Sequence, residues 1–135
     1  MTNAVALLVP VGPKHAERIW AEPAEGGRFR LRSIPFLAEG MSWGDLVEVE
    51  AGRVSRVVER GGHSTYRLTL TGPASDEEFA LLWAPLAALG CVCESSQGGR
   101  FAIDVPPDSN ASLVRAALEA GATAGDWTIT PADVR

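Results

Sequence analysis

The sequence is short of basic residues, and this shortage excludes two classes of partner. Lys and Arg number 12 against 17 Asp and Glu, which leaves a net charge of −5 and a pI near 5.0. Proteins that bind nucleic acids or anionic membranes need a surplus of positive charge to neutralise phosphate groups. We therefore expect neither a nucleic acid nor a membrane among the partners of this protein.

Long hydrophobic runs are also missing. The most apolar stretch near the start, residues 4–10, is too short to cross a bilayer and has no basic segment before it of the kind that signal peptides carry. We expect no transmembrane helix and no signal peptide, which favours a cytoplasmic protein. Residues 1–14 are interpreted as an N-terminal extension that is either disordered or lies along the body as an additional strand.

Cysteine is scarce, and the two cysteines are poorly placed for a disulfide. Cys91 and Cys93 are separated by one residue, so on a strand they share a face with their α-carbons about 6.5–7 Å apart and a stiff chain between them. No third cysteine completes a zinc site, and His15 and His63 lie far away in the sequence. We expect buried, reduced thiols, as in a reducing cytosol, with no metal site and no cofactor; a redox pair is the alternative.

The first half of the chain predicts a small β-barrel. Residues 15–64 contain short strand-like segments separated by glycine turns. Phe29 and Leu31 alternate with arginines, which is the period-2 pattern of a half-buried strand. The connection over residues 34–45 is unusually apolar for a loop, and we expect it to pack over one end of the barrel.

The second half, residues 65–135, predicts a β-α-β-β-α-β succession. Tyr66, Leu68 and Leu70 alternate with polar residues, and Ser75 followed by three acidic residues is a typical helix start. Pro85 falls inside that helix and should kink or split it. Two helices on one face of a four-stranded antiparallel sheet form the ferredoxin-like arrangement. The predicted fold is therefore α+β, a small barrel-like half followed by a ferredoxin-like half.

Residues 59–67 gather charged, imidazole and hydroxyl groups around a glycine pair, and residues 42–45 read as an exposed turn. Polar groups this diverse either build a tight turn or line a binding site. His63 is the foremost candidate because an imidazole with a pKa of about 6.5 can act as acid, base or donor at neutral pH. The alternative is that it bonds the backbone and holds the turn. The candidate binding residues are Trp43, Asp45, Glu59, Arg60, His63 and Ser64.

Catalytic arrangements of these residues meet geometric objections. A triad would need His63 and Ser64 with Asp45 or Glu59, yet neighbours on an extended strand point to opposite faces. No Gly-x-Ser-x-Gly motif supports a nucleophile elbow. Residues 60–62 could cradle a phosphate through glycine amides beside a guanidinium, although they match neither a Walker loop nor a dinucleotide fingerprint.

Three motifs in succession resemble one protein family. They are residues 17–22 (Glu-Arg-Ile-Trp-Ala-Glu), residues 34–36 with 40–45 (Ile-Pro-Phe and Gly-Met-Ser-Trp-Gly-Asp), and residues 57–67 (Val-Val-Glu-Arg-Gly-Gly-His-Ser-Thr-Tyr-Arg). This succession is similar to DUF4265, a family of small bacterial proteins with no assigned function. The resemblance implies a stand-alone bacterial cytoplasmic protein whose recurrent surface is formed by residues 42–45 and 62–67.

Two classes of function remain. The first is a non-enzymatic binding or protein-interaction module, regulatory or immunity-like, whose acidic charge would suit a basic protein partner; a homodimer also fits. The second is a small enzyme or small-molecule binder with a cleft between the two halves, using His63 with Asp45, Glu59 or Arg60. We favour binding over catalysis and leave the identity of the partner or ligand open.

Overall fold

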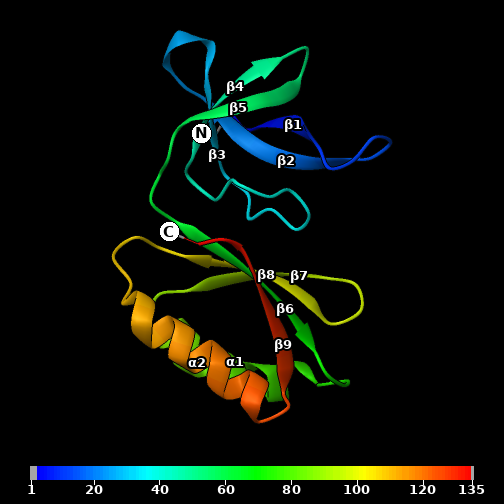
Figure 1. The fold of residues 1–135 in the computed structure, drawn as a ribbon, viewed down its shortest axis with the longest axis vertical. Coiled ribbons are helices and arrows are strands. Elements are labelled where there is room, and N and C mark those ends of the chain that lie inside the picture. Colours follow the sequence, from blue (N-terminus) through cyan, green and yellow to red (C-terminus); the bar gives the residue numbers. More distant parts are fainter. Residues whose placement is uncertain (1–2, 135) are drawn as a thin grey trace.

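The computed structural model describes residues 3–134 and has an α+β fold, as the sequence predicts (Figure 1). A closed five-stranded barrel is followed by a four-stranded sheet with two helices. The barrel strands are β1 (Val5–Pro10), β2 (Ala16–Pro23), β3 (Phe29–Leu31), β4 (Leu46–Glu50) and β5 (Arg53–Glu59), with a short 3-10 helix, η1 (Glu25–Gly27), before β3. The second half consists of β6 (Ser64–Leu70), α1 (Asp76–Ala88), β7 (Val92–Ser96), β8 (Arg100–Val105), α2 (Ala111–Thr123) and β9 (Trp127–Asp133).

The N-terminal run forms the first strand of the barrel. β1 pairs with β2 along its whole length and meets β5 in parallel at Leu8 and Arg53, which closes the barrel. Leu7 and Val9 point inward and are each 4% exposed. Of the two alternatives for this run, the additional strand is the one observed, so the barrel begins at β1 and includes residues assigned above to an extension.

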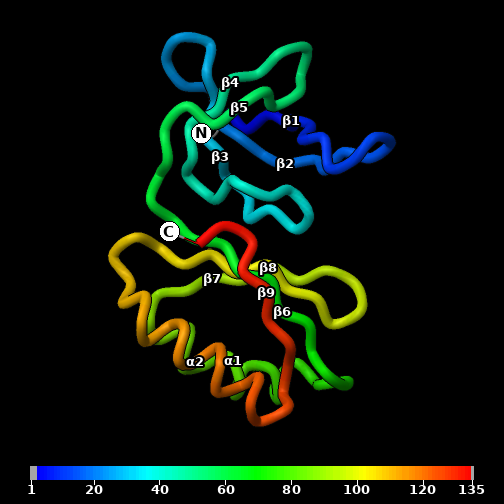
Figure 2. Tube along the Cα trace, viewed as in Figure 1, coloured from blue at the N-terminus to red at the C-terminus, as the bar shows by residue number. Residues whose placement is uncertain are grey.

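The apolar linker between β3 and β4 packs against the barrel and faces the second half of the molecule (Figure 2). Ala38 and Met41 are buried in the barrel core. The carboxylate of Glu17 on β2 accepts the backbone N–H groups of Phe36, Leu37 and Ala38 at 2.7, 3.0 and 2.8 Å. These three bonds hold the tip of the linker in one conformation.

The second sheet has the strand order β7-β8-β6-β9, with every neighbouring pair antiparallel. Both helices cover one face (Figure 1), where Tyr66, Leu68 and Ile103 of the strands meet Leu86 of α1 and Leu118 of α2. A capping box between Ser75 and Glu78 begins α1. The helix runs through Pro85 without being split.

The opposite face of this sheet is polar and turns towards the linker and the barrel. Thr65 and Arg67 on β6 alternate with the core residues and therefore point to this side. Asp104 on β8 pairs with Thr65 in register and shares the same face. No helix among residues 3–134 is long and apolar enough to cross a bilayer.

Candidate functional site

The two polar segments singled out in the sequence meet at the joint between the barrel and the second sheet. Residues 42–45 end the linker, and residues 60–64 carry the chain from β5 to β6. Gly61 lies so close to Gly44 that a Cβ atom at Gly61 would stand 2.6 Å from the Gly44 carbonyl oxygen. The approach is possible only without a side chain, and it brings the two segments into direct contact.

Asp45 ties these segments together. Its side chain is fully buried, and one carboxylate oxygen, Oδ2, accepts the backbone N–H of Ser42 at 3.0 Å. The other oxygen, Oδ1, accepts the backbone N–H of Gly61 at 2.8 Å. Because each oxygen already bonds a backbone amide, the structure uses this carboxylate as a brace between the linker and the β5–β6 connection.

A second set of polar groups joins the end of β9 to the same place. The Ser42 and Thr65 hydroxyl oxygens are 2.6 Å apart, and the Ser42 hydroxyl donates to Oδ2 of Asp133 at 2.7 Å. Arg60 forms an ion pair with Oδ1 of Asp133 at 3.2 Å and donates to the Gly40 carbonyl. The Arg60 side chain is about half exposed, so this outer pair is the weaker part of the network.

His63 is paired with Asp104. Its Nδ1 lies 2.9 Å from both carboxyl oxygens, and the side chains of His63 and Asp104 are 19% and 7% exposed. Burial raises the pKa of the Asp104 carboxyl, and the hydrogen bond and charge of His63 oppose that rise. The other edge of the ring packs beside Gly44, where a Cβ atom would lie 3.4 Å from Cδ2. Nε2 is therefore the nitrogen left for other contacts.

The partner of His63 is thus none of the three residues proposed from the sequence. Asp45 and Arg60 take part in the neighbouring braces described above. Glu59 is exposed at the end of β5, and its side chain forms no hydrogen bond or ion pair within residues 3–134. Trp43 is half-buried, and the guanidinium of Arg32 lies 5.8 Å from its ring centroid. The six candidates therefore belong to one region without forming a single cluster around the imidazole.

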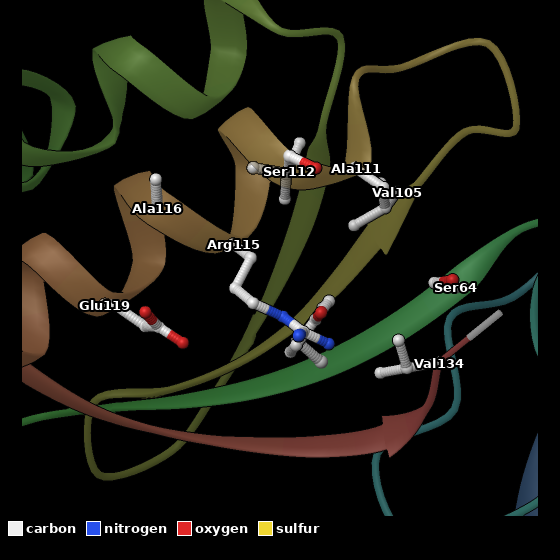
Figure 3. A pocket seen from close by; sticks show the side chains of 10 residues that line it. Ser64, Val105, Ala111, Ser112, Arg115, Ala116, Glu119 and Val134 are labelled. Atoms are coloured by element: carbon white, nitrogen blue, oxygen red, sulfur yellow. The ribbon is translucent and has the colours of Figure 1, made fainter.

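Ser64 points away from His63, as expected for neighbours entering a strand. It is buried and lines a cavity of about 350 Å³ between α2 and the sheet, together with Tyr66, Arg115 and Glu119 (Figure 3). In this view Arg115 reaches from α2 towards the strands. Because His63 bonds Asp104 on the opposite face of the sheet, the two side chains do not assemble a nucleophile and base.

The cysteines and acidic residues among residues 3–134 are also of types that bind metal ions, but they do not gather into a metal site. Within the part of the chain that the structure describes, no group of three or more His, Cys, Asp and Glu side chains is placed to hold a metal ion. Cys91 is buried and Cys93 is half-buried, both as free thiols. Burial, with the nearby charge of Asp104 adding to it, raises the pKa of Cys91 to about 11, so this thiol is protonated at neutral pH.

The candidate binding residues did not include four members of the joint, Ser42, Thr65, Asp104 and Asp133, although Ser42 and Thr65 lie within the segments 42–45 and 62–67 that the family resemblance indicated. A signal for one of them exists in the sequence. Asp104 lies between Ile103 and Val105 in a segment that is otherwise apolar from Phe101 to Val105, and a charged residue there usually has a buried partner. No comparable signal identifies the hydroxyls, because they meet only after distant segments fold together.

The fold defines a class of small two-part α+β protein in which a closed barrel is braced against an antiparallel sheet. A crystal structure titled as that of a hypothetical protein from Neisseria gonorrhoeae has a similar fold, with a TM-score of 0.79 at 14% sequence identity. The similarity covers 99% of this chain and 96% of that one.

The family can also be stated. The sequence profile described as "Domain of unknown function (DUF4265)" matches residues 17–129. The chain therefore belongs to this family, which confirms the resemblance seen in the three motifs. No curated protein matches the chain.

Proposed function

We propose that this protein is a non-enzymatic binding or protein-interaction module of the bacterial cytosol, with a regulatory or immunity-like role. One observation carries the proposal: the residues best suited to acid–base chemistry act as braces. Both oxygens of Asp45 hold backbone amides, and Nδ1 of His63 holds the buried Asp104. Groups engaged in this way stabilise a shape, and a stable shape is what recognition requires.

The hydroxyl groups near the joint support the same conclusion. A nucleophile must lie within hydrogen-bond reach of its base and be open to a substrate. Ser42 and Thr65 are both fully buried and bonded to each other, and the Ser42 hydroxyl also donates to Asp133. Ser64 faces the helices on the other side of the sheet. A binding role needs none of these hydroxyls to be reactive.

The proposed origin, location and fold class of the second half are each supported by a further observation. A bacterial origin is supported by the similar fold of the gonococcal protein, and a cytosolic location by two thiols that are free in the structure. We assign the second half to the ferredoxin-like class on its strand order and its two helices on one face. Such sheets offer their other face for contacts, by analogy of fold.

The alternative is a small enzyme or small-molecule binder that works between the two halves. It is favoured by the geometry of His63 itself. A carboxylate on Nδ1 fixes the tautomer of an imidazole and leaves Nε2 as an acceptor, which is how a general base is commonly oriented. In this alternative Asp104 would position His63, and Arg60 would lie at the rim.

Native mass spectrometry of the tagged protein, isolated gently from its host, tests the two alternatives. We expect a bound molecule in fixed stoichiometry that is retained by His63→Ala and by His15→Ala, a control at the exposed second histidine. Charge-state distributions establish that each variant is folded. Loss of the molecule only in a folded His63→Ala variant, or its chemical conversion by every form except that one, would contradict the proposal and favour an enzyme.

A further inference from the structure

A separate cleft lies where the tip of the linker overhangs the polar face of the second sheet. It has a volume of about 440 Å³, within the range of small-ligand pockets. None of its lining residues belongs to the brace around Asp45 or to the His63–Asp104 pair. The residues that shape it are Phe36, Leu37, Arg67, Thr69, Ser96 and Arg100.

The cleft is positively charged in a protein whose net charge is −5. Its two charged lining residues are Arg67 on β6 and Arg100 on β8, and no acidic residue lines it. Within residues 3–134, the guanidinium of Arg100 forms no ion pair or hydrogen bond. Arg67 donates from Nη2 to the Ala38 carbonyl at 2.6 Å, yet its Nε is buried without a hydrogen-bond partner in the described chain. Two guanidinium groups without an acidic residue beside them favour an anion in the cleft.

The walls of the cleft are held in place before any ligand binds. Glu17 fixes the amides of Phe36, Leu37 and Ala38, and the Ala38 carbonyl in turn holds Arg67. The linker tip and one arginine are therefore connected through a short chain of hydrogen bonds. A site that is already ordered loses less entropy on binding.

The other lining groups indicate what kind of anion fits. Thr69 and Ser96 add hydroxyl donors on the sheet floor, and Phe36 and Leu37 form an apolar wall on the linker side. Leu37 is 60% exposed, which is high for a leucine held in a fixed loop. Guanidinium groups bind carboxylate and phosphate through paired N–H donors, and an apolar wall binds a hydrocarbon group beside them.

We infer that this cleft binds a small organic anion with a carboxylate or phosphate head and an apolar body. The head lies between Arg67 and Arg100, where it accepts from guanidinium N–H groups, and the body packs against Phe36 and Leu37. This inference rests on the proposed binding function and names its ligand class. The His63 joint takes no part in it.

Titrations of the ¹⁵N-labelled protein followed by NMR test the inference, with phenyl phosphate, benzoate, inorganic phosphate and phenol as probes. We expect saturable shifts at Leu37, Thr69 and Arg100 with phenyl phosphate or benzoate, and the tighter of the two identifies the head group. Phenol and inorganic phosphate each lack one part of the ligand, so each should bind about 10-fold more weakly or worse.

Two variants and one control locate the interaction. Arg100→Gln should weaken binding of the organic anion about 10-fold or more, because a charge-assisted hydrogen bond is lost. Leu37→Ala should weaken the binding of phenyl phosphate several-fold and leave the binding of inorganic phosphate unchanged, because only phenyl phosphate has an apolar body. Arg53→Gln is the control, since Arg53 is also an exposed strand arginine but lies on the barrel.

Three results would overturn the inference. They are the absence of saturable shifts with every probe, shifts that centre away from the cleft, and equal weakening by Arg53→Gln and Arg100→Gln, which would indicate non-specific charge attraction. None of these results bears on the native mass-spectrometric test, because that test uses the ligand from the host rather than these probes. Failure of the cleft and failure of the binding function are therefore distinguishable.

Discussion

Gly61 shows how closely the two segments of the joint approach each other. Its backbone conformation is open to other residues, since its φ lies outside the left-handed region, but a Cβ atom would stand 2.6 Å from the Gly44 carbonyl oxygen and 2.7 Å from its carbon. Both obstacles are backbone atoms, which cannot move aside as a side chain does. The residue is required for space rather than for its dihedral angles.

Gly61→Ala should therefore lower the free energy of unfolding by about 1–3 kcal/mol, the usual cost of forcing an extra methyl group into a packed site. Urea unfolding measured by circular dichroism provides the value. Gly72→Ala is the matched control, because a Cβ atom there meets nothing within 4 Å and φ is again outside the left-handed region. Equal stability of Gly61→Ala and the control would mean that the segments separate at little cost.

Asp104 should make stability depend on pH with a definite sign. Burial raises the pKa of its carboxyl above the ordinary 3.8, so in mildly acidic solution the folded protein keeps a proton that the unfolded chain has lost. The free energy of unfolding contributed by this group therefore falls as pH rises from about the unfolded pKa through the raised folded pKa. Urea unfolding at several pH values should show this fall in the wild type relative to Asp104→Asn. If the free energy of unfolding changed with pH in the same way in the wild type and in Asp104→Asn, this prediction would be contradicted.

At the scale of elements, helix α1 tolerates a proline that ought to interrupt it. Pro85 lies three residues before the end of Asp76–Ala88 and has no N–H to donate to the Leu81 carbonyl. Leu81 is 77% exposed, so water has access beside the lost hydrogen bond. The sequence correctly predicts the helix, but it cannot tell that the last turn continues through the proline, because packing of Leu86 in the core outweighs the local preference.

Pro85→Ala should restore that hydrogen bond and raise the free energy of unfolding by about 1–3 kcal/mol, since alanine is the best helix former and proline the worst. Thermal unfolding followed by circular dichroism measures the gain. Ala84→Gly at the neighbouring exposed position should instead lower stability by about 1 kcal/mol. If Pro85→Ala were no more stable than the wild type, the missing hydrogen bond at the proline would cost the helix no stability, which would contradict the prediction.

The elements that alternate clearly were predictable from sequence, and those set by distant partners were not. Tyr66, Leu68 and Leu70 identify β6 by period-2 alternation, and Ser75 identifies the start of α1. The N-terminal run is apolar on both faces, so it shows no such period, and its role in closing the barrel depends on pairing with β2 and β5. Local pattern determines the type of an element, whereas closure depends on contacts far along the chain.

The candidate site shows the same division. The sequence singled out residues 42–45 and 59–64, and the structure brings the two segments together, but it buries Ser42 and Asp45, which were expected in an exposed turn. The His63–Asp104 pair was missed because it joins residues 41 positions apart. Register between β6 and β8 brings Asp104 opposite Thr65, and such register cannot be derived from either segment alone.

For the whole molecule, the joint is polar while each half has an apolar core of its own. One buried cluster fills the barrel, and the other lies between the second sheet and its helices. The relative position of the halves therefore depends on Asp45, on the Ser42–Thr65–Asp133 contacts, and on His63 with Asp104. Directional hydrogen bonds define one arrangement more sharply than apolar contacts do.

The central claim is that His63 braces the joint, and a double-mutant cycle of His63→Ala and Asp104→Ala tests it most directly. We expect His63→Ala alone to lower the free energy of unfolding in urea by about 1–3 kcal/mol, because it leaves a buried carboxyl without its partner. The double variant should be more stable than the sum of the two single losses predicts, by at least about 1 kcal/mol. A stable His63→Ala protein with additive effects would contradict the claim and return His63 to the list of functional candidates.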